Sequence, residues 1–259
     1  MTGKALYYTS PILSMTHGFF TRHGGCSEGI YDSLQCAYST KDDIRSNVAH
    51  NRSIAAQALG VSSESLVFGK QDHTDTVLQV EKYGQDLQNT VGDSLVTQLS
   101  GVALCVLTAD CAPVLLEDSK AGIVAAVHSG WKGALRGVLA KTVDMICALG
   151  GTRENIVAAL GPCIGKKSYE TGPEFIEQFI AQDKSNRQFF ISSARENHYM
   201  FDMQGYIVRQ LKNCGAMQIS CLEMDTYSDE DFFSNRRSFI HKKTDYGRLV
   251  SIIVNKKNQ

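Results

Sequence analysis

Two histidines and one cysteine are the clearest candidates for a chemical role in this sequence. His73, Cys111 and His128 lie far apart in the chain, and imidazole and thiolate are the ligands that zinc prefers in tetrahedral sites. Structural zinc sites use closely spaced ligand pairs, whereas ligands recruited singly from three segments are typical of a preassembled catalytic pocket. The three residues are therefore a candidate metal site. Taken alone, each is more commonly a packed, hydrogen-bonded residue at a strand end.

The stretch 102–133 places two of these residues at the ends of apolar runs. Three short runs rich in Val and Leu, each bounded by turn residues, predict core strands at 102–108, 113–116 and 122–127. Asp110 and Cys111 follow the first run, and His128 follows the third. Because strand ends are rigid, a thiol and an imidazole are expected to meet there. Trp131, the only tryptophan, is expected to shield the site.

Two glycine turns and a pair of arginines have both a structural and a functional interpretation. The turns at 21–25 and 161–165 could be tight connections, or their glycines could let the backbone approach a ligand. Arg22 offers a planar fork for an oxyanion or phosphate. The segment 232–237 could be an exposed edge with solvated arginines, or it could bring two cations toward an anionic substrate. No dinucleotide-binding glycine motif follows a strand.

Outside this stretch, hydrophobic periodicity predicts helices and strands in irregular alternation. Helices are expected at 43–59, 131–149 and 203–213, with another beginning at Pro173, and further strands at 17–20, 66–68, 76–80, 94–97, 155–160, 216–222 and 249–254. The polar segment 183–197 predicts no regular structure. Strands in groups with interspersed helices predict an α+β (mixed α/β) fold. Without repeats or linkers, residues 1–259 are expected to form a single domain.

Composition argues against several classes of function. The 259 residues carry a formal net charge of −1, without a concentrated basic patch, so no nucleic-acid partner is expected. No apolar run reaches the roughly 18 residues of a membrane span, and no secretory signal is recognisable, so no membrane partner is expected. The eight cysteines are scattered without a CxxC pair, which predicts reduced thiols in the cytoplasm. Whether the chain is a monomer or a dimer stays open.

Several motifs together resemble one bacterial family. They are HGFFTRHGG and YDSL within 17–34, Asn51-Arg52, Gln71-Asp72-His73, GDSLVT at 92–97, LTADCAPVLL at 107–116, VAAVHSGWKG at 124–133, LGPCIG with Tyr169-Glu170 at 160–170, Phe201-Asp202-Met203 and FFSNRR at 232–237. The sequence resembles the polyphenol-oxidase or laccase-domain proteins, also described as peptidoglycan editing factor and as zinc-dependent purine nucleoside phosphorylase. The resemblance spans nearly the whole chain.

This resemblance implies a metal, a fold and an activity. It implies that His73, Cys111 and His128 bind Zn²⁺, with copper as an alternative ion in vitro. It implies a β-sandwich of mixed sheets flanked by helices, similar to the catalytic domain of cytotoxic necrotizing factor. The implied reaction is phosphorolysis of adenosine, inosine and methylthioadenosine to free base and pentose 1-phosphate, with adenosine deamination as a second activity. Nucleoside and phosphate are then the expected small-molecule partners.

Roles for individual residues follow as hypotheses. The expected substrate-binding residues are Arg22, Arg52, Gln71 and Arg237. Of these, Arg22 and Arg52 are expected to position phosphate, because guanidinium binds such anions in a bidentate manner. Asp110 is grouped with the three metal ligands as catalytic. It is expected to orient His128 or to act as acid or base, since ligating imidazoles usually need a hydrogen-bond acceptor behind them.

The chain departs from the family's usual pattern at a few positions. Ser129 and Lys132 replace the usual alanine and arginine of the HAGWRG stretch, and Lys132 keeps the charge but loses bidentate anion recognition. Asp225 replaces a cysteine, and Asn235 replaces the tyrosine of SYRR. The candidate metal ligands are untouched, so these departures bear on substrate preference and phosphate contacts.

Three other functions fit parts of the pattern. Cys111 could be a nucleophile with His128 or His73 as its base, in an amidase that edits peptidoglycan precursors. Chelation would abolish zinc chemistry but spare such a thiol. A polyphenol oxidase with several coppers is disfavoured because the seven histidines are dispersed and form no His-x-His pair. A non-catalytic binding module predicts that replacing His73 changes ligand affinity with no turnover to lose.

Overall fold

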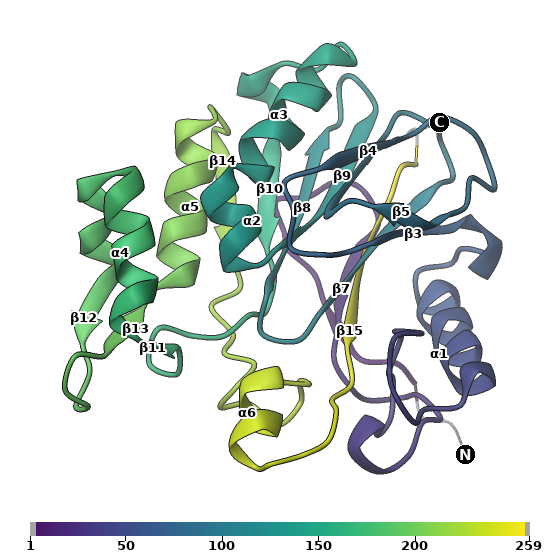
Figure 1. Cartoon of the computed structure of the whole chain (residues 1–259). Coiled ribbons are helices and arrows are strands. Elements are labelled where there is room, and N and C mark those ends of the chain that lie inside the picture. The colour runs from purple at the N-terminus through teal and green to yellow at the C-terminus, as the bar shows by residue number, and fades with distance from the viewer. Residues whose placement is uncertain (1–3, 257–259) are drawn as a thin grey trace.

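Two six-stranded sheets face each other in the computed structural model, which describes residues 4–256, and helices cover their outer faces (Figure 1). The first sheet has the order β1 (Tyr7–Tyr8), β2 (His17–Phe20), β15 (Leu249–Val254), β7 (Ala103–Thr108), β3 (Leu66–Lys70), β5 (Leu87–Val91). The second has the order β14 (Gln218–Cys221), β10 (Val157–Leu160), β8 (Ala112–Asp118), β9 (Ile123–Ser129), β6 (Ser94–Thr97), β4 (Val77–Val80). A small third sheet contains β11 (Glu170–Thr171), β13 (Tyr199–Phe201) and β12 (Phe190–Ser192).

Both large sheets are mixed. Antiparallel pairs such as β8–β9 and β7–β15 stand beside parallel pairs such as β3–β7 and β10–β14. The mixed α/β fold predicted from the sequence is therefore confirmed. Strands β8 and β9 are buried along their whole length, which explains why residues 112–116 and 123–127 appear as continuous apolar runs rather than as alternating patterns.

The interior of the sandwich is apolar. Side chains that point inward from the first sheet include Val67, Leu104 and Ile253, and they pack against Leu115 and Val124 of the second sheet. Burying such side chains stabilises the fold by about 1.5–3 kcal/mol each relative to leaving them in water. This core holds the two sheets, and the loops at their ends, in a defined relation.

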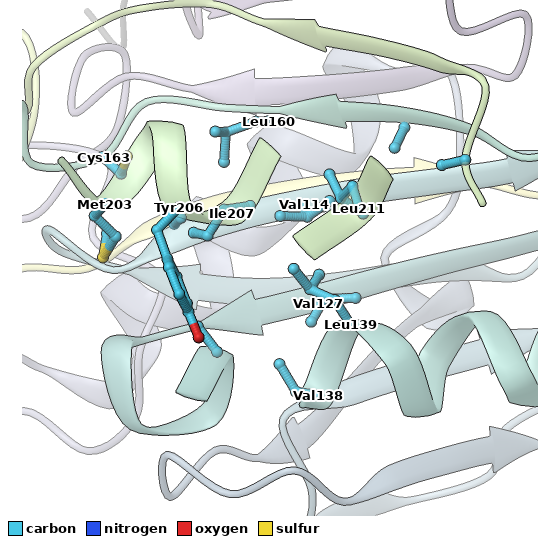
Figure 2. Close-up of a cluster of buried hydrophobic side chains, with 14 of the residues drawn as sticks. Val114, Val127, Val138, Leu139, Leu160, Cys163, Met203, Tyr206, Ile207 and Leu211 are labelled. Carbon is cyan, nitrogen blue, oxygen red and sulfur yellow. The ribbon is translucent and has the colours of Figure 1, made fainter. Parts of the chain in front are cut away.

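The helices are α1 (Arg45–Ala58), α2 (Trp131–Arg136), α3 (Val138–Ala148), α4 (Pro173–Gln182), α5 (Met203–Asn213) and α6 (Asn235–Ile240). Helix α1 packs on the outer face of the first sheet through Ala55, together with Leu59 directly after the helix. Helices α3 and α5 cover the outer face of the second sheet, where Leu139 and Leu211 lie near Val127 and Val114 (Figure 2). The structure is thus layered as helix, sheet, sheet and helix.

Some predicted elements differ from those observed. The single helix expected at 131–149 is two helices, because Gly137 adopts φ +91°, a left-handed conformation that ends α2 and begins α3. The segment 183–197 contains a 3₁₀ helix at Lys184–Phe189 and strand β12. Within residues 4–256, no helix has the length and apolar character that crossing a bilayer requires.

Candidate functional site

The three predicted ligand residues meet at one end of the sandwich. His73 lies on the connection from β3 to β4, Cys111 immediately precedes β8, and His128 lies near the end of β9. Their ligand atoms all lie within 4.8 Å of one another, and within residues 4–256 they form the one such group of three or more His, Cys, Asp or Glu side chains. Cys111 Sγ is 3.7 Å from His73 Nε2. The ring centroids of His73 and His128 are 5.0 Å apart.

A buried carboxylate that the sequence analysis did not single out positions two of these ligands. Asp93 accepts a hydrogen bond from Nδ1 of His128 at 2.7 Å and others from the backbone N–H groups of residues 72–74. The first bond fixes the His128 ring, and the others hold the loop on which His73 adopts φ +55°. Burial opposes ionisation of Asp93, but these donors outweigh it and lower its pKa to about 2. The sequence signal that could have identified Asp93 is its position as a single charged residue directly before the buried strand 94–97.

The cysteine and the histidines shift one another's protonation. Burial disfavours the thiolate, but the charge and hydrogen bonds of the two imidazoles outweigh it and lower the pKa of Cys111 to about 6. Burial also opposes charge on His128, yet the Cys111 thiolate and the Asp93 carboxylate raise its pKa to about 9. The site thus stabilises deprotonated sulfur, which is the form that binds a metal.

The distance between the Cys111 sulfur and one His73 nitrogen fits a tetrahedral ion. With a Zn–S bond of about 2.3 Å and a Zn–N bond of about 2.1 Å, two donors at a tetrahedral angle lie roughly 3.6 Å apart. The separation between Cys111 Sγ and His73 Nε2 is 3.7 Å. One sulfur and two imidazole nitrogens, with Asp93 behind His128, form the kind of three-ligand set that leaves a coordination position open. The residues present therefore fit a catalytic zinc ion.

Gly130 lies directly against two of the predicted ligands. A Cβ atom at this position would stand 2.7 Å from Cδ2 of His73 and 3.1 Å from Sγ of Cys111. We expect Gly130→Ala to displace these side chains and to weaken zinc binding at least about tenfold, equivalent to 1.4 kcal/mol. Competition with a chelator of known affinity would measure this change. Ser129→Ala is the control, because the buried Ser129 hydroxyl has no hydrogen-bond partner in the described structure; equal zinc affinity of the two variants would refute the prediction.

Asp110 has a different partner from the one predicted. Its carboxylate accepts hydrogen bonds from the Thr226 hydroxyl at 2.7 Å and from the backbone N–H of Arg236 at 2.6 Å. The expectation that Asp110 orients His128 is wrong, since Asp93 makes that bond. Burial raises the pKa of Asp110 despite its hydrogen bonds. Asp110 instead ties the Cys111 loop to the first turn of α6.

The four predicted substrate-binding residues are not all brought together. Arg52 and Gln71 line a cavity beside the ligand cluster. The Gln71 side chain exchanges two hydrogen bonds with the backbone of Leu107, which anchors the start of the His73 loop. Arg22 is absent from this lining; it donates to the Asp32 carbonyl and stacks on Phe233.

The segment 232–237 was not recognised as the start of a helix. Arg237 donates to the backbone carbonyls of Thr226, Tyr227 and Phe232, so it stabilises the loop before α6 rather than facing the cluster. The edge suggested for this segment is also wrong, because Phe232 and Phe233 are buried and α6 begins at Asn235.

Two cavities adjoin the ligand cluster. The larger has a volume of about 440 Å³, and its wall includes all three ligand residues together with Arg52. The smaller has a volume of about 160 Å³, and Trp131 forms part of its wall, as the shielding role predicted for it requires. The cluster therefore lies in the wall of an accessible site.

Comparison with known proteins places this site in a family. A family model described as multi-copper polyphenol oxidoreductase laccase matches residues 16–256. The chain belongs to this laccase family. A Corynebacterium glutamicum relative named purine nucleoside phosphorylase is 35% identical over 223 residues, which cover 85% of this chain and 87% of that one. A Haemophilus influenzae relative of the same name is 32% identical over 240 residues, covering 92% and 93%.

Solved structures share the fold of this laccase-family chain. The crystal structure of the Bacillus licheniformis hypothetical protein YfiH has a TM-score of 0.84 and 28% identity, covering 93% of this chain and 92% of that one. YlmD from Geobacillus stearothermophilus has a TM-score of 0.84 and 26% identity, covering 99% and 97%. The family predicted from the motifs is confirmed, and the similarity to cytotoxic necrotizing factor stays a prediction.

Proposed function

We propose that the protein is a zinc-dependent purine nucleoside phosphorylase, converting adenosine, inosine or methylthioadenosine and phosphate into free base and pentose 1-phosphate. One observation carries this proposal. The cluster of His73, Cys111 and His128 lies in the wall of a cavity, and the same wall contains the buried guanidinium of Arg52. The names of the curated relatives support it. We also propose that the chain forms a single catalytic domain.

The larger cavity has the size of a small-molecule site and a charge that suits phosphate. Its volume of about 440 Å³ lies within the range of roughly 300–1,000 Å³ that is usual for small-molecule sites. Its wall carries the cations Arg52, Lys70 and Arg248 against the single carboxylate of Asp72. A cavity with this balance of charge attracts an anion such as phosphate.

Arg52 is the group best placed to hold that anion. Its Nε donates to the Cys36 carbonyl at 2.8 Å, and its guanidinium lies 3.7 Å from the ring centre of Phe68 and 4.2 Å from that of Tyr38. Among residues 4–256, no carboxylate forms an ion pair with it, although the residue is only 9% exposed. Burial of an unpaired cation is unfavourable, which favours a ligand of opposite charge.

The residues divide the work of phosphorolysis. The zinc ion would be held by His73, Cys111 and His128, and when bound it would act as a Lewis acid. Asp93 keeps the His128 ring in place through its hydrogen bond to Nδ1. Arg52 holds phosphate in a fixed position, which removes much of the entropic barrier to its attack on the pentose.

Arg52→Gln should raise the KM for phosphate by about 10- to 100-fold, since a hydrogen bond to a charged group is worth about 1.5–3 kcal/mol. The KM for inosine should change much less. Initial rates of hypoxanthine and ribose 1-phosphate formation by zinc-loaded protein, measured across phosphate concentrations, test this. Arg45→Gln is the matched control, because Arg45 also stacks on Tyr38 but lies outside the cavity wall. Absence of ribose 1-phosphate formation by the zinc-loaded wild type would remove the proposed function.

Other activities enter the same assay as separate outcomes. Adenosine deamination, which we propose as a secondary activity, would release inosine and ammonia without phosphate. Amide hydrolysis by a Cys111 nucleophile is the second candidate, because the thiol pKa is lowered and His73 Nε2 lies 3.7 Å from the sulfur. A site with several coppers needs more donors than the single ligand group within residues 4–256 supplies.

We place the protein in the cytoplasm, where its eight free cysteines would stay reduced.

A further inference from the structure

The smaller cavity shares part of its wall with the larger one. Its volume is about 160 Å³, against about 440 Å³ for the larger cavity. His73, Ala109, Cys111 and Asn235 line both cavities. The smaller cavity is therefore the more confined of the two, and it can receive one part of a molecule whose remainder lies in the larger cavity.

We propose that the purine ring of the substrate enters the smaller cavity, while the pentose and phosphate lie in the larger one. This inference rests on the proposed function. In a direct displacement, phosphate approaches the anomeric carbon from the face opposite the departing base, so the two groups need separate binding places that meet at that carbon. Two adjoining cavities with a shared wall at His73 and Cys111 meet this requirement.

The wall of the smaller cavity suits a flat aromatic ring. Trp131 and Tyr169 contribute aromatic side chains, and Ile164 and Met203 contribute apolar ones. Phe175 buttresses both aromatic rings, with its ring centre 4.6 Å from that of Trp131 and 5.8 Å from that of Tyr169. Planar heterocycles bind well between such groups because stacking adds to apolar burial.

One cation in this wall is placed to assist the departure of the base. The Arg236 guanidinium lies 5.3 Å from the ring centre of Tyr169, and its Nη1 donates to the Glu170 carbonyl at 2.8 Å. No carboxylate within residues 4–256 pairs with it at ion-pair distance. Its charge is thus available to a group that becomes negative in the cavity.

The reaction has a simple balance in this arrangement. A phosphate oxygen forms a bond to the anomeric carbon, and the bond from that carbon to N9 breaks with its electron pair left on the purine. The purine then takes up one proton, which equals the proton that dihydrogen phosphate loses on becoming the pentose ester. Arg236 stabilises the negative charge on the purine before the proton arrives.

The single tryptophan makes this placement directly measurable. Trp131 is the only tryptophan in the chain and lines the smaller cavity. Titration of zinc-loaded protein with hypoxanthine should therefore give saturable quenching of its fluorescence, at concentrations where equilibrium dialysis shows one bound base per chain. Inorganic phosphate alone should bind without comparable quenching, because Arg52 does not line that cavity.

Variants of the cavity wall complete the test. Ile164→Phe adds bulk to the cavity and should weaken hypoxanthine binding about tenfold or more, the scale of a misfit in a fitted pocket. If Ile164→Phe does not fold, Tyr169→Leu, which removes one aromatic wall, should weaken binding similarly. Hypoxanthine that binds without quenching Trp131, or that fails to bind, overturns the inference even if phosphorolysis is observed. Quenching without any phosphorolysis would instead overturn the proposed function and leave the base site standing.

Discussion

Cys111→Ser is expected to lose both bound zinc and phosphorolysis. The thiolate is one of only three protein donors in the cluster, and serine oxygen is a poor replacement because it does not ionise near neutral pH. Loss of the hydrogen-bond partner of a metal ligand lowers metal affinity by about 10- to 100-fold. Loss of the ligand itself should therefore lower the affinity by more than about 100-fold. Phosphorolysis should fall at least about 1,000-fold, because a Lewis acid contributes several kcal/mol. Metal analysis after dialysis and a turnover assay measure both effects.

Chelation of the wild type separates this interpretation from a thiol nucleophile. Removing the metal should stop phosphorolysis, and returning zinc should restore it. A Cys111 nucleophile would instead retain amide hydrolysis in chelated protein and lose it in Cys111→Ser. Cys147→Ser is the control, since Cys147 lies on α3 outside both cavities and its replacement should leave zinc content and turnover unchanged. Full zinc occupancy in Cys111→Ser would contradict the proposed site.

Asp93→Asn is expected to lower zinc affinity by about 10- to 100-fold, although residue 93 is not itself a predicted ligand. The carboxylate holds the His128 ring and the backbone of the His73 loop simultaneously, and it is 1% exposed. An amide presents one acceptor oxygen and an NH₂ group that cannot accept a hydrogen bond, so some of these donors would lose their partner. Zinc competition experiments and turnover at saturating zinc measure the change.

Stability gives a second measurement for the same variant. The pKa of Asp93 is lowered from 3.8 to about 2, so its carboxylate contributes about 2 kcal/mol to folding above pH 4. That contribution is lost as the pH falls toward 2, and Asp93→Asn should lack this part of the pH dependence. Asp118→Asn is a suitable control, because Asp118 is equally buried and accepts backbone hydrogen bonds from Ala121 and Thr152 away from the cluster. An equal loss of zinc affinity in both variants would show that the effect is general destabilisation.

The sequence predicted the central strands and their polar ends well, because strands buried on both faces leave an unmistakable run of apolar residues. The strand predicted at 249–254 and the helix predicted at 203–213 have the observed bounds. The break at Gly137 was missed because apolar residues continue at helical spacing on both sides of it. Helix α6 was missed because its six residues bury none of their side chains, so no amphipathic pattern marks it.

The details of the site were less predictable because they depend on contacts between distant segments. The neighbouring sequence does not distinguish Arg52 from Arg237. Arg52 forms no ion pair and faces a cavity, whereas the Arg237 side chain donates hydrogen bonds to backbone carbonyls. Asp110 stands next to Cys111, a predicted ligand, whereas the carboxylate that supports His128 comes from Asp93 on another strand connection. The approach of Asp93 follows from the pairing of β6 with β9, which no short motif encodes.

Two of the predicted metal donors lie on connections that pass between the layers of the sandwich. The His73 segment runs from β3 of the first sheet to β4 of the second, and the Cys111 segment runs from β7 to β8 in the same way. A bound ion would therefore act as a cross-link that fastens one layer to the other. Because binding to the folded chain alone favours it over the unfolded one, an ion bound here would raise the temperature at which the protein unfolds, to an extent set by the concentration of that ion.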